Sequence, residues 1–235
     1  MSVNFVRKDD IDKFIPITIK IADHFSVKRS YIRTFCKMVR NTSRLNVINM
    51  SSQLNVIQST FSSFVDGGSE LCQILLDAFG ECQDKSDLDK LRGSLAEGLL
   101  LGRYGNDILQ SKTFGWGAQV HVQNKKGPNV LKVKYNCPHH NNIEYPDCVS
   151  RSTVDLGLWD GEYGEFFECK VKPDNIGCPE MSYMKVLNKE LTKKGIKHTL
   201  YFVSTDTREA MKMKIEKKHP KENFYEVLSL QETNS

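Results

Sequence analysis

The strongest constraint on the fold of this 235-residue chain is a pair of short apolar runs separated by a turn-like segment. The runs span residues 153–159 and 165–171, and both have the composition of β-strands. Residues 160–163 between them have the length of a common four-residue hairpin loop. We therefore expect an antiparallel β-hairpin. Since successive side chains of a strand point to opposite faces, the register of this hairpin decides which side chains meet.

The register set by a four-residue loop places two carboxylates opposite each other. It pairs Trp159 with Gly164, Gly157 with Phe166, and Asp155 with Glu168. Lys170 follows Glu168 by two residues and shares its face of the strand. Directly opposed side chains have their Cβ atoms roughly 5 Å apart, so two like charges would repel each other without a shield. Mg²⁺ would supply such a shield, because carboxylate oxygens are among its preferred ligands.

This constellation resembles the signature of the PD-(D/E)XK nuclease superfamily, in which an acidic residue on one strand is followed by an acid-x-Lys motif on the next. The resemblance implies that Asp155, Glu168 and the backbone carbonyl of Cys169 bind Mg²⁺, with Mn²⁺ as a substitute. It implies that Lys170 positions the attacking water and stabilises charge on the scissile phosphate. It further implies an endonuclease that hydrolyses phosphodiester bonds of DNA, with a role in restriction or antiviral defence. RNA stays open as a substrate.

Two alternatives stand beside this interpretation of the acidic residues. Val154 occupies the position of the proline in the family's signature, whereas a literal Pro-Asp pair ends at Asp147. We favour Asp155 over Asp147, because Asp147 lies in a turn-like stretch without strand periodicity. The second alternative is that Glu168 and Lys170 form a solvated pair on the surface of a hairpin. Apolar residues on both faces of the strand argue against it, since they indicate burial.

A helix is predicted upstream of the hairpin, at about residues 86–110. Its first residue and Asp89 have the spacing of a capping box, and apolar residues follow on two nearly opposite faces. Glu97 is aligned with one of these apolar stripes. The family resemblance gives Glu97 the role of a helical glutamate that assists through a second metal or a water. The alternative is that Glu97 is paired with Arg92 or Arg103.

The order of elements predicts a mixed α/β fold. Strands at residues 116–123 and 130–135 precede the hairpin, and a helix, a strand, a helix and a strand follow it at residues 179–194, 198–204, 207–218 and 224–230. Together with the helix upstream, this order is similar to the restriction-endonuclease-like core, a central mixed β-sheet flanked by helices. We therefore expect two regions. Residues 1–85 form a mainly α-helical N-terminal region of unknown role, and residues 86–235 form a nuclease-like domain.

Cysteines and histidines cluster in the loop segments on either side of the hairpin. Cys137, His139, His140 and Cys148 precede it, and Cys178 follows it. Structural zinc is held by four Cys or His ligands, so we consider a zinc site formed by Cys137, His139, Cys148 and Cys178. The spacing lacks a paired Cys-x-x-Cys motif, and the alternative is that these are loop residues with unrelated thiols.

Composition excludes several classes of protein. Charged residues make up 26% of the chain, and no apolar run approaches the ~18 residues that span a bilayer. The charged N-terminal segment argues against a signal peptide, and seven cysteines without framework spacing favour reduced thiols in the cytoplasm. A homodimer, or a partner protein in a larger complex, is compatible with the sequence. The rival to a nuclease is a non-catalytic nucleic-acid-binding or assembly module that retains the nuclease fold.

Overall fold

The computed structural model describes residues 2–8, 13–45, 50–105, 113–123, 129–140, 142–146 and 148–232. The chain forms two compact units, which we call the sheet unit and the helical unit. The sheet unit comprises Met1–Asp10, Ser111–Val203 and Arg208–Leu228. The helical unit comprises Ile11–Gln110, Ser204–Thr207 and Ser229–Ser235.

This division differs from the boundary expected between residues 85 and 86. The first strand of the chain belongs to the sheet unit, whereas the helix after residue 84 belongs to the helical unit. The first strand pairs with a strand more than a hundred residues later, from Ser2 with Gln123 to Arg7 with Ala118. A local sequence pattern does not reveal such a long-range pairing.

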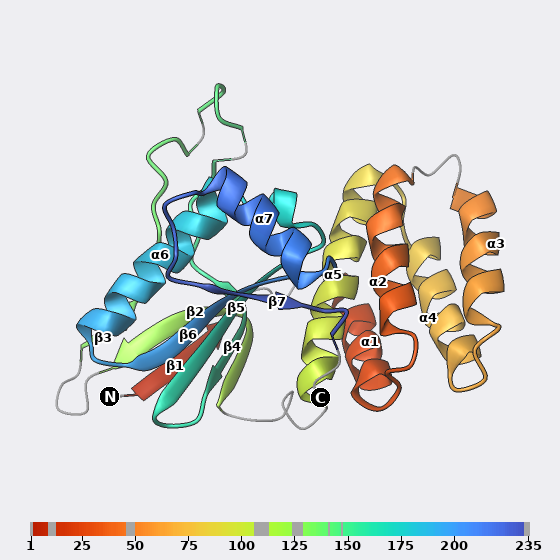
Figure 1. Ribbon diagram of the computed structural model, residues 1–235, viewed down its shortest axis with the longest axis horizontal. Helices are drawn as coiled ribbons and strands as arrows, with labels where there is room; N and C mark the ends of the chain where they lie inside the picture. Colours follow the sequence, from red (N-terminus) through yellow and green to blue (C-terminus); the bar gives the residue numbers. More distant parts are fainter. Residues whose placement is uncertain are drawn as a thin grey trace. The chain divides into compact units, whose positions relative to one another are not determined.

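A mixed β-sheet forms the centre of the sheet unit (Figure 1). Its strands among the described residues are β1 (Ser2–Arg7), β2 (Phe114–Gln123), β3 (Val130–Lys132), β4 (Val154–Trp159), β5 (Tyr163–Lys170), β6 (Lys197–Ser204) and β7 (Glu226–Ser229). Their order is β1-β2-β4-β5-β6-β7, and β3 pairs with β2 outside this path. The pairs β1/β2, β2/β3, β2/β4 and β4/β5 are antiparallel.

Helices make the connections in the second half of the sheet. The short 3₁₀ helix η3 (Pro173–Asn175) and the helix α6 (Cys178–Lys193) lie between β5 and β6, and α7 (Arg208–Lys218) lies between β6 and β7. Crossover helices of this type join parallel strands. The predicted fold class, a mixed sheet flanked by helices with a helical N-terminal region, is confirmed.

The predicted hairpin and its register are also confirmed. β4 and β5 pair Leu156 with Phe167, Gly157 with Phe166, Leu158 with Glu165 and Trp159 with Gly164. The loop is closed by a hydrogen bond of 3.2 Å from the backbone N–H of Asp160 to the carbonyl oxygen of Tyr163. The Asp160 carboxylate also accepts hydrogen bonds from the backbone N–H groups of Glu162 and Tyr163, as short acidic side chains do in turns. The next pair in this register is Asp155 with Glu168.

The core of the sheet unit lies between one face of the sheet and the helices α6 and α7 (Figure 1). It includes Val120, Val154, Phe166 and Phe202 from the strands, the predicted stripe Met181, Met184, Leu187 and Leu191 from α6, and Met211 and Ile215 from α7. Glu168 lies two residues after Phe166 on β5 and therefore points to the same face. The carboxylate of the acid-x-Lys motif thus lies on the face of the sheet that the helices cover.

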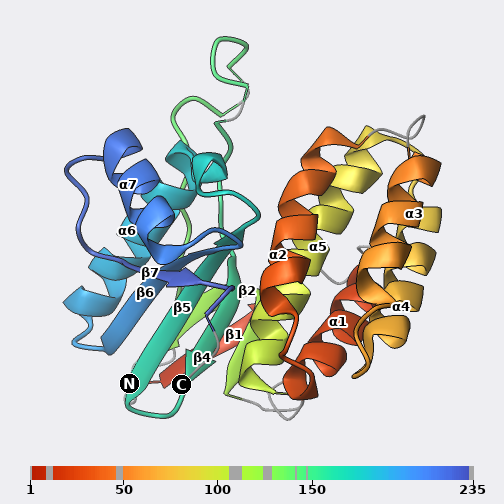
Figure 2. The same ribbon diagram turned by 45° about the vertical axis from the view of Figure 1, so that its right-hand side comes forward.

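The helical unit is built from α1 (Ile15–Val27), α2 (Ile32–Asn41), the 3₁₀ helix η1 (Thr42–Arg44), α3 (Met50–Phe61), α4 (Gly68–Gly80) and α5 (Lys85–Tyr104) (Figure 2). α5 packs closely on α1. A Cβ atom at Gly98 would lie 2.7 Å from the carbonyl oxygen of Thr18, and one at Gly102 would lie 2.7 Å from that of Ala22. Glycine at these two positions therefore allows the close approach of the two helices.

The ends of α5 differ from the expected ones. The residue that caps its N-terminus is Asp84, whose carboxylate accepts a hydrogen bond of 2.8 Å from the backbone N–H of Asp87, so the predicted start at Ser86 was two residues late. The helix ends at Tyr104, where Gly105 adopts a φ of +88°, and residues 106–110 lie outside the described part of the chain. Among the described residues, no helix is both long and apolar enough to cross a bilayer.

Candidate active site and metal-binding group

The sheet unit brings together the three residues of the predicted acidic site. Glu168 on β5 is fully buried, and the Nζ atom of Lys170 lies 2.7 Å from its carboxylate. On β4, Oδ2 of Asp155 accepts a hydrogen bond of 2.7 Å from the backbone N–H of Cys169, between the other two residues. The strand register and this hydrogen bond hold the Asp155 carboxylate beside the acid-x-Lys motif.

The shield between the two carboxylates is an arginine that the sequence analysis missed. Nη2 of Arg151 lies 2.6 Å from a carboxylate oxygen of Glu168 and 3.2 Å from Oδ1 of Asp155. Arg151 is held by an isolated antiparallel bridge with Tyr135, with backbone hydrogen bonds of 2.8 and 2.9 Å. No periodic pattern in the sequence marks this residue, because it follows a long turn-rich loop and precedes β4.

A third carboxylate, that of Glu180, completes the cluster. Its Oε1 lies 3.4 Å from Nη1 of Arg151 and 3.6 Å from Nζ of Lys170. Its Oε2 accepts a hydrogen bond of 2.9 Å from the backbone N–H of Gly177, which caps α6. The Gly-x-x-Glu spacing is a helix-start signal and does not by itself indicate a site. We call Arg151, Asp155, Glu168, Lys170 and Glu180 the ion-pair cluster.

Burial makes the charges of the ion-pair cluster costly. Burial, the largest influence, together with the nearby carboxylates of Asp155 and Glu180, raises the pKa of Glu168 to about 7, although Arg151 and Lys170 act in the opposite direction. Burial also opposes the charges of Arg151 and Lys170, but the carboxylates around them raise the pKa of both side chains. Three carboxylates thus share two permanent cations.

Two atoms of the cluster are buried without a hydrogen-bond partner among the described residues. They are Oε1 of Glu168 and Nε of Arg151. Oε1 of Glu168 nevertheless lies 2.6 Å from Nη2 of Arg151 and 2.7 Å from Nζ of Lys170. Ion pairs therefore compensate this buried oxygen, for which no hydrogen bond is present among the described residues.

Other residues of the predicted site have different environments. Glu97 is half-buried on α5 of the helical unit, whereas all five members of the ion-pair cluster lie in the sheet unit. Its assisting role stays a prediction. Asp147, the alternative to Asp155, lies outside the described residues. The thiol of Cys169 is buried, in agreement with a core position.

Three of the four residues of the predicted zinc site come together. The ligand atoms of Cys137, His139 and Cys148 all lie within 4.8 Å of one another. The fourth predicted residue, Cys178, lies with its thiol 3.9 Å from the hydroxyl of Tyr135. His140 is engaged differently, since its Nδ1 accepts a hydrogen bond of 3.3 Å from the backbone N–H of Ser150. These residues form a group that could hold a metal ion.

Electrostatics within this group couple its thiols. Burial disfavours a thiolate at Cys137, but hydrogen bonds from the Tyr135 hydroxyl, the His139 backbone and the other two thiols lower its pKa. Burial, followed by the hydrogen bond to Cys137, raises the pKa of Cys148 to about 11. One thiolate is therefore stabilised at the expense of its neighbour.

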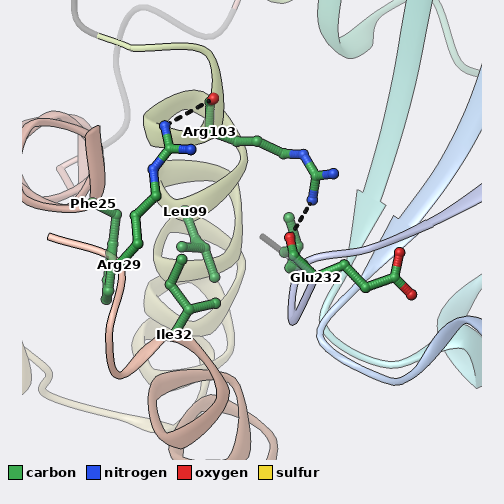
Figure 3. Close-up of a pocket in the computed structure, with 7 residues that line it drawn as sticks. Phe25, Arg29, Ile32, Leu99, Arg103 and Glu232 are labelled. Carbon is green, nitrogen blue, oxygen red and sulfur yellow. Dashed lines mark hydrogen bonds between the residues drawn. The ribbon is translucent and has the colours of Figure 1, made fainter. Parts of the chain in front are cut away.

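A groove of about 540 Å³ adjoins both groups within the sheet unit. Its lining includes Cys148 of the group formed with Cys137 and His139, Glu180 of the ion-pair cluster, and also Cys178 and Lys218. The helical unit contains a much smaller pocket lined by Phe25, Leu99 and other side chains (Figure 3). Its volume of about 10 Å³ is room for roughly one water, so it is not a ligand site.

Comparisons with known proteins give limited information. Neither a protein-family model nor a curated protein matches the sequence. A similar solved structure is that of protein VC1899 from Vibrio cholerae, with 11% sequence identity and a TM-score of 0.40. The alignment covers 98% of this chain and 56% of that chain, so this chain spans about half the length of that protein. We draw nothing about function from a likeness at this TM-score.

Proposed function

We propose that this protein is a Mg²⁺-dependent endonuclease that hydrolyses phosphodiester bonds of DNA at the ion-pair cluster. The observation that carries the proposal is the convergence of Asp155 and Lys170 on a fully buried Glu168. Buried titratable groups with shifted pKa values favour functional sites over purely structural ones. The arrangement also matches the resemblance to PD-(D/E)XK nucleases.

The donor set fits Mg²⁺. Asp155 and Glu168 offer hard carboxylate oxygens from adjacent strands, and a cation would take the place of ion pairs that these oxygens already make. The backbone carbonyl of Cys169 is the further ligand that the resemblance implies. When bound, Mg²⁺ would polarise a phosphoryl oxygen and favour ionisation of a water. The guanidinium of Arg151 neutralises the same two carboxylates, so it must withdraw from at least one of them when a cation binds.

The protein's own side chains have separate roles in this proposal. Lys170 would orient the attacking water and stabilise charge on the phosphate, as its ammonium lies within 4 Å of both Glu168 and Glu180. Arg151, once released from Asp155 and Glu168, would present a planar guanidinium suited to a phosphate. Glu97 would assist through a second metal or a water, as the resemblance implies.

The direct test is cleavage of supercoiled, linear and single-stranded DNA and of RNA, with and without Mg²⁺. We expect cleavage of DNA that requires Mg²⁺ or Mn²⁺, and a large loss of cleavage in Lys170→Ala. Lys172→Ala is the matched control, because Lys172 is a nearby lysine outside the ion-pair cluster. Absence of metal-dependent cleavage of every substrate by the wild-type protein would overturn the proposal.

One observation favours a second candidate, a non-catalytic nucleic-acid-binding or assembly module. Arg151 and Lys170 already pair with the carboxylates of the cluster, so a metal is not required to neutralise them. This candidate predicts binding of nucleic acid without cleavage, and equal binding by the wild-type protein and Glu168→Gln. The first candidate predicts that Glu168→Gln abolishes cleavage.

For the group of Cys137, His139 and Cys148 we propose zinc as the metal. Thiolate and imidazole ligands at this separation are typical of structural zinc sites, whereas Mg²⁺ avoids them. Metal analysis of the purified protein tests this proposal independently of any nuclease activity.

A further inference from the structure

We propose that Cys178 is the fourth ligand of this zinc site, and that the bound metal ties the β3–β4 loop to the start of α6 and thereby positions Arg151 and Glu180 at Glu168. The inference rests on the proposed zinc identity, and its consequence for catalysis rests on the proposed nuclease function. It assigns to the metal-binding group a role in holding the ion-pair cluster together.

The first step is the fourth ligand. Cys137, His139 and Cys148 lie in the loop between β3 and β4, which extends away from the sheet in both ribbon views (Figures 1 and 2). Cys178 is the first residue of α6, where its thiol lies 3.9 Å from the hydroxyl of Tyr135 and lines the same groove as Cys148. Three thiols and one imidazole are a complete tetrahedral set for structural zinc.

Each loop ligand is close in sequence to the residues that hold Arg151. Cys137 follows Tyr135 by two residues, and the backbone of Tyr135 makes both hydrogen bonds of the bridge to Arg151. Cys148 precedes Arg151 by three residues. The backbone N–H of Cys137 also donates a hydrogen bond of 3.1 Å to the Ser150 hydroxyl, beside Arg151. A metal bound by both Cys137 and Cys148 would therefore hold the two backbone segments that form this bridge.

The proposed fourth ligand, Cys178, is likewise close in sequence to Glu180. Cys178 and Glu180 both lie in the first turn of α6, where the Glu180 carboxylate accepts the hydrogen bond from Gly177. The contact of 3.4 Å between Arg151 and Glu180 joins the loop to α6. Since both residues are anchored next to zinc ligands, one metal ion would hold the backbone on both sides of this contact.

The loop between β3 and β4 is long, and this is the physical reason that a metal is needed to hold it in place. The loop has one isolated bridge as its regular structure among the described residues from Val133 to Thr153. Ordering a long loop loses conformational entropy, and the binding free energy of a structural metal offsets that loss. Without the metal, we expect Arg151 and Glu180 to leave their positions around Glu168.

Metal content tests the ligand set without any nucleic acid. We expect the purified full-length protein to carry stoichiometric zinc, and Cys178→Ser and His139→Asn to bind it at least roughly 100-fold more weakly, since loss of an outer-shell partner alone weakens binding by up to about that factor. His140→Asn and Cys82→Ser are matched controls that should retain zinc, because His140 bonds to Ser150 and Cys82 is a buried thiol of the helical unit. Wild-type protein that neither contains nor takes up zinc would overturn the proposal, and wild-type affinity in Cys178→Ser would overturn the fourth ligand.

Cobalt substitution keeps the proposal testable if a variant does not fold. Wild-type protein loaded with Co²⁺ should show strong thiolate-to-metal charge transfer and the intense visible absorption of a tetrahedral site. Cys178→Ser should lose part of the charge-transfer intensity. A weak octahedral spectrum in the wild-type protein would contradict a site with three thiolates.

Hydrogen exchange tests the positioning role. Removal of zinc with a chelator should speed exchange at the amides of Tyr135 and Arg151 and at residues 177–181, while β6 stays protected as an internal control. If hydrogen exchange in these segments is unchanged after zinc is removed, the metal does not position Arg151 and Glu180, even if zinc is bound. Because none of these three measurements uses DNA, failure of this inference is distinguishable from failure of the nuclease proposal.

Discussion

Two partly buried arginines, one in each unit, show how differently a fold can use the same side chain. In the helical unit, Nη1 of Arg103 donates hydrogen bonds of 3.1 and 2.8 Å to the carbonyl oxygens of Ser229 and Glu232, and its own carbonyl oxygen accepts one from Arg29 (Figure 3). In the sheet unit, Arg151 faces three carboxylates instead. Burial lowers the pKa of Arg103, whereas the carboxylates raise that of Arg151 despite burial.

In our proposal, the difference separates a structural role from a functional one. Backbone carbonyls are neutral acceptors, and Arg103 uses them to join α5 to the segment after β7 within the helical unit. Carboxylates can exchange one cation for another, and in our proposal those around Arg151 accept Mg²⁺ in place of the guanidinium.

The largest expected effect is on catalysis. We expect Glu168→Gln to reduce Mg²⁺-dependent cleavage to background, because an amide cannot supply the ligand charge of the buried carboxylate. Glu165→Gln, on the opposite face of the same strand, is the control and should cleave normally. Cleavage assays with matched thermal unfolding would check this, and full activity of Glu168→Gln would remove the ion-pair cluster as the active site.

The comparison of the two arginines predicts different responses to Mg²⁺. Arg151→Met leaves Glu168 and Asp155 without their shared cation, so we expect a loss of about 3–5 kcal/mol in the free energy of unfolding. Addition of Mg²⁺ should recover part of that loss, because the metal replaces the guanidinium. Denaturant unfolding with and without Mg²⁺ measures both effects.

Arg103→Met is the matched control for that experiment. It removes hydrogen bonds from a charged donor to two carbonyl oxygens, and we expect a loss of about 1.5–3 kcal/mol. The acceptors of these hydrogen bonds are neutral backbone carbonyls and not carboxylates, so Mg²⁺ should not restore its stability. Equal rescue of both variants by Mg²⁺ would show that the effect is unrelated to the cluster.

The pKa of Glu168 gives a prediction for pH. Because this pKa is raised from 4.5 to about 7 in the folded protein, the protonated carboxyl contributes stability that is fully present below pH 4.5 and is lost as the pH rises through about 7. Mg²⁺ needs the ionised form, so its affinity should rise by about tenfold per pH unit up to that value. Titration calorimetry over this range checks it, and Glu168→Gln should show no such dependence.

The smallest effect concerns the start of α5 in the helical unit. Asp84→Ala removes the side-chain cap and should lower the free energy of unfolding by about 1 kcal/mol, whereas Ser86→Ala, at the position first expected to begin the helix, should change it little. Cleavage should be unaffected by either change. A larger loss for Ser86→Ala would contradict the observed position of the cap.

Local patterns predicted part of the sheet unit well. The alternation of side chains and the length of the loop at residues 160–163 were enough to give the register of the hairpin, since strand pairing there is between neighbours in sequence. The stripe of α6 was predicted by the same reasoning at helical spacing. The residue types of Cys137, His139, Cys148 and Cys178 indicated a metal group, although their spacing did not.

The sequence by itself determined the hairpin, its register and the convergence of Asp155, Glu168 and Lys170, because these depend on contacts between adjacent strands. Only the tertiary structure decided that Arg151 lies between the carboxylates and that Glu180 joins them. It also decided that β1 completes the sheet from the start of the chain. These contacts join segments that are separated in sequence by loops or helices. The packing of the whole sheet unit brings such segments together, and no periodic pattern in the local sequence predicts it.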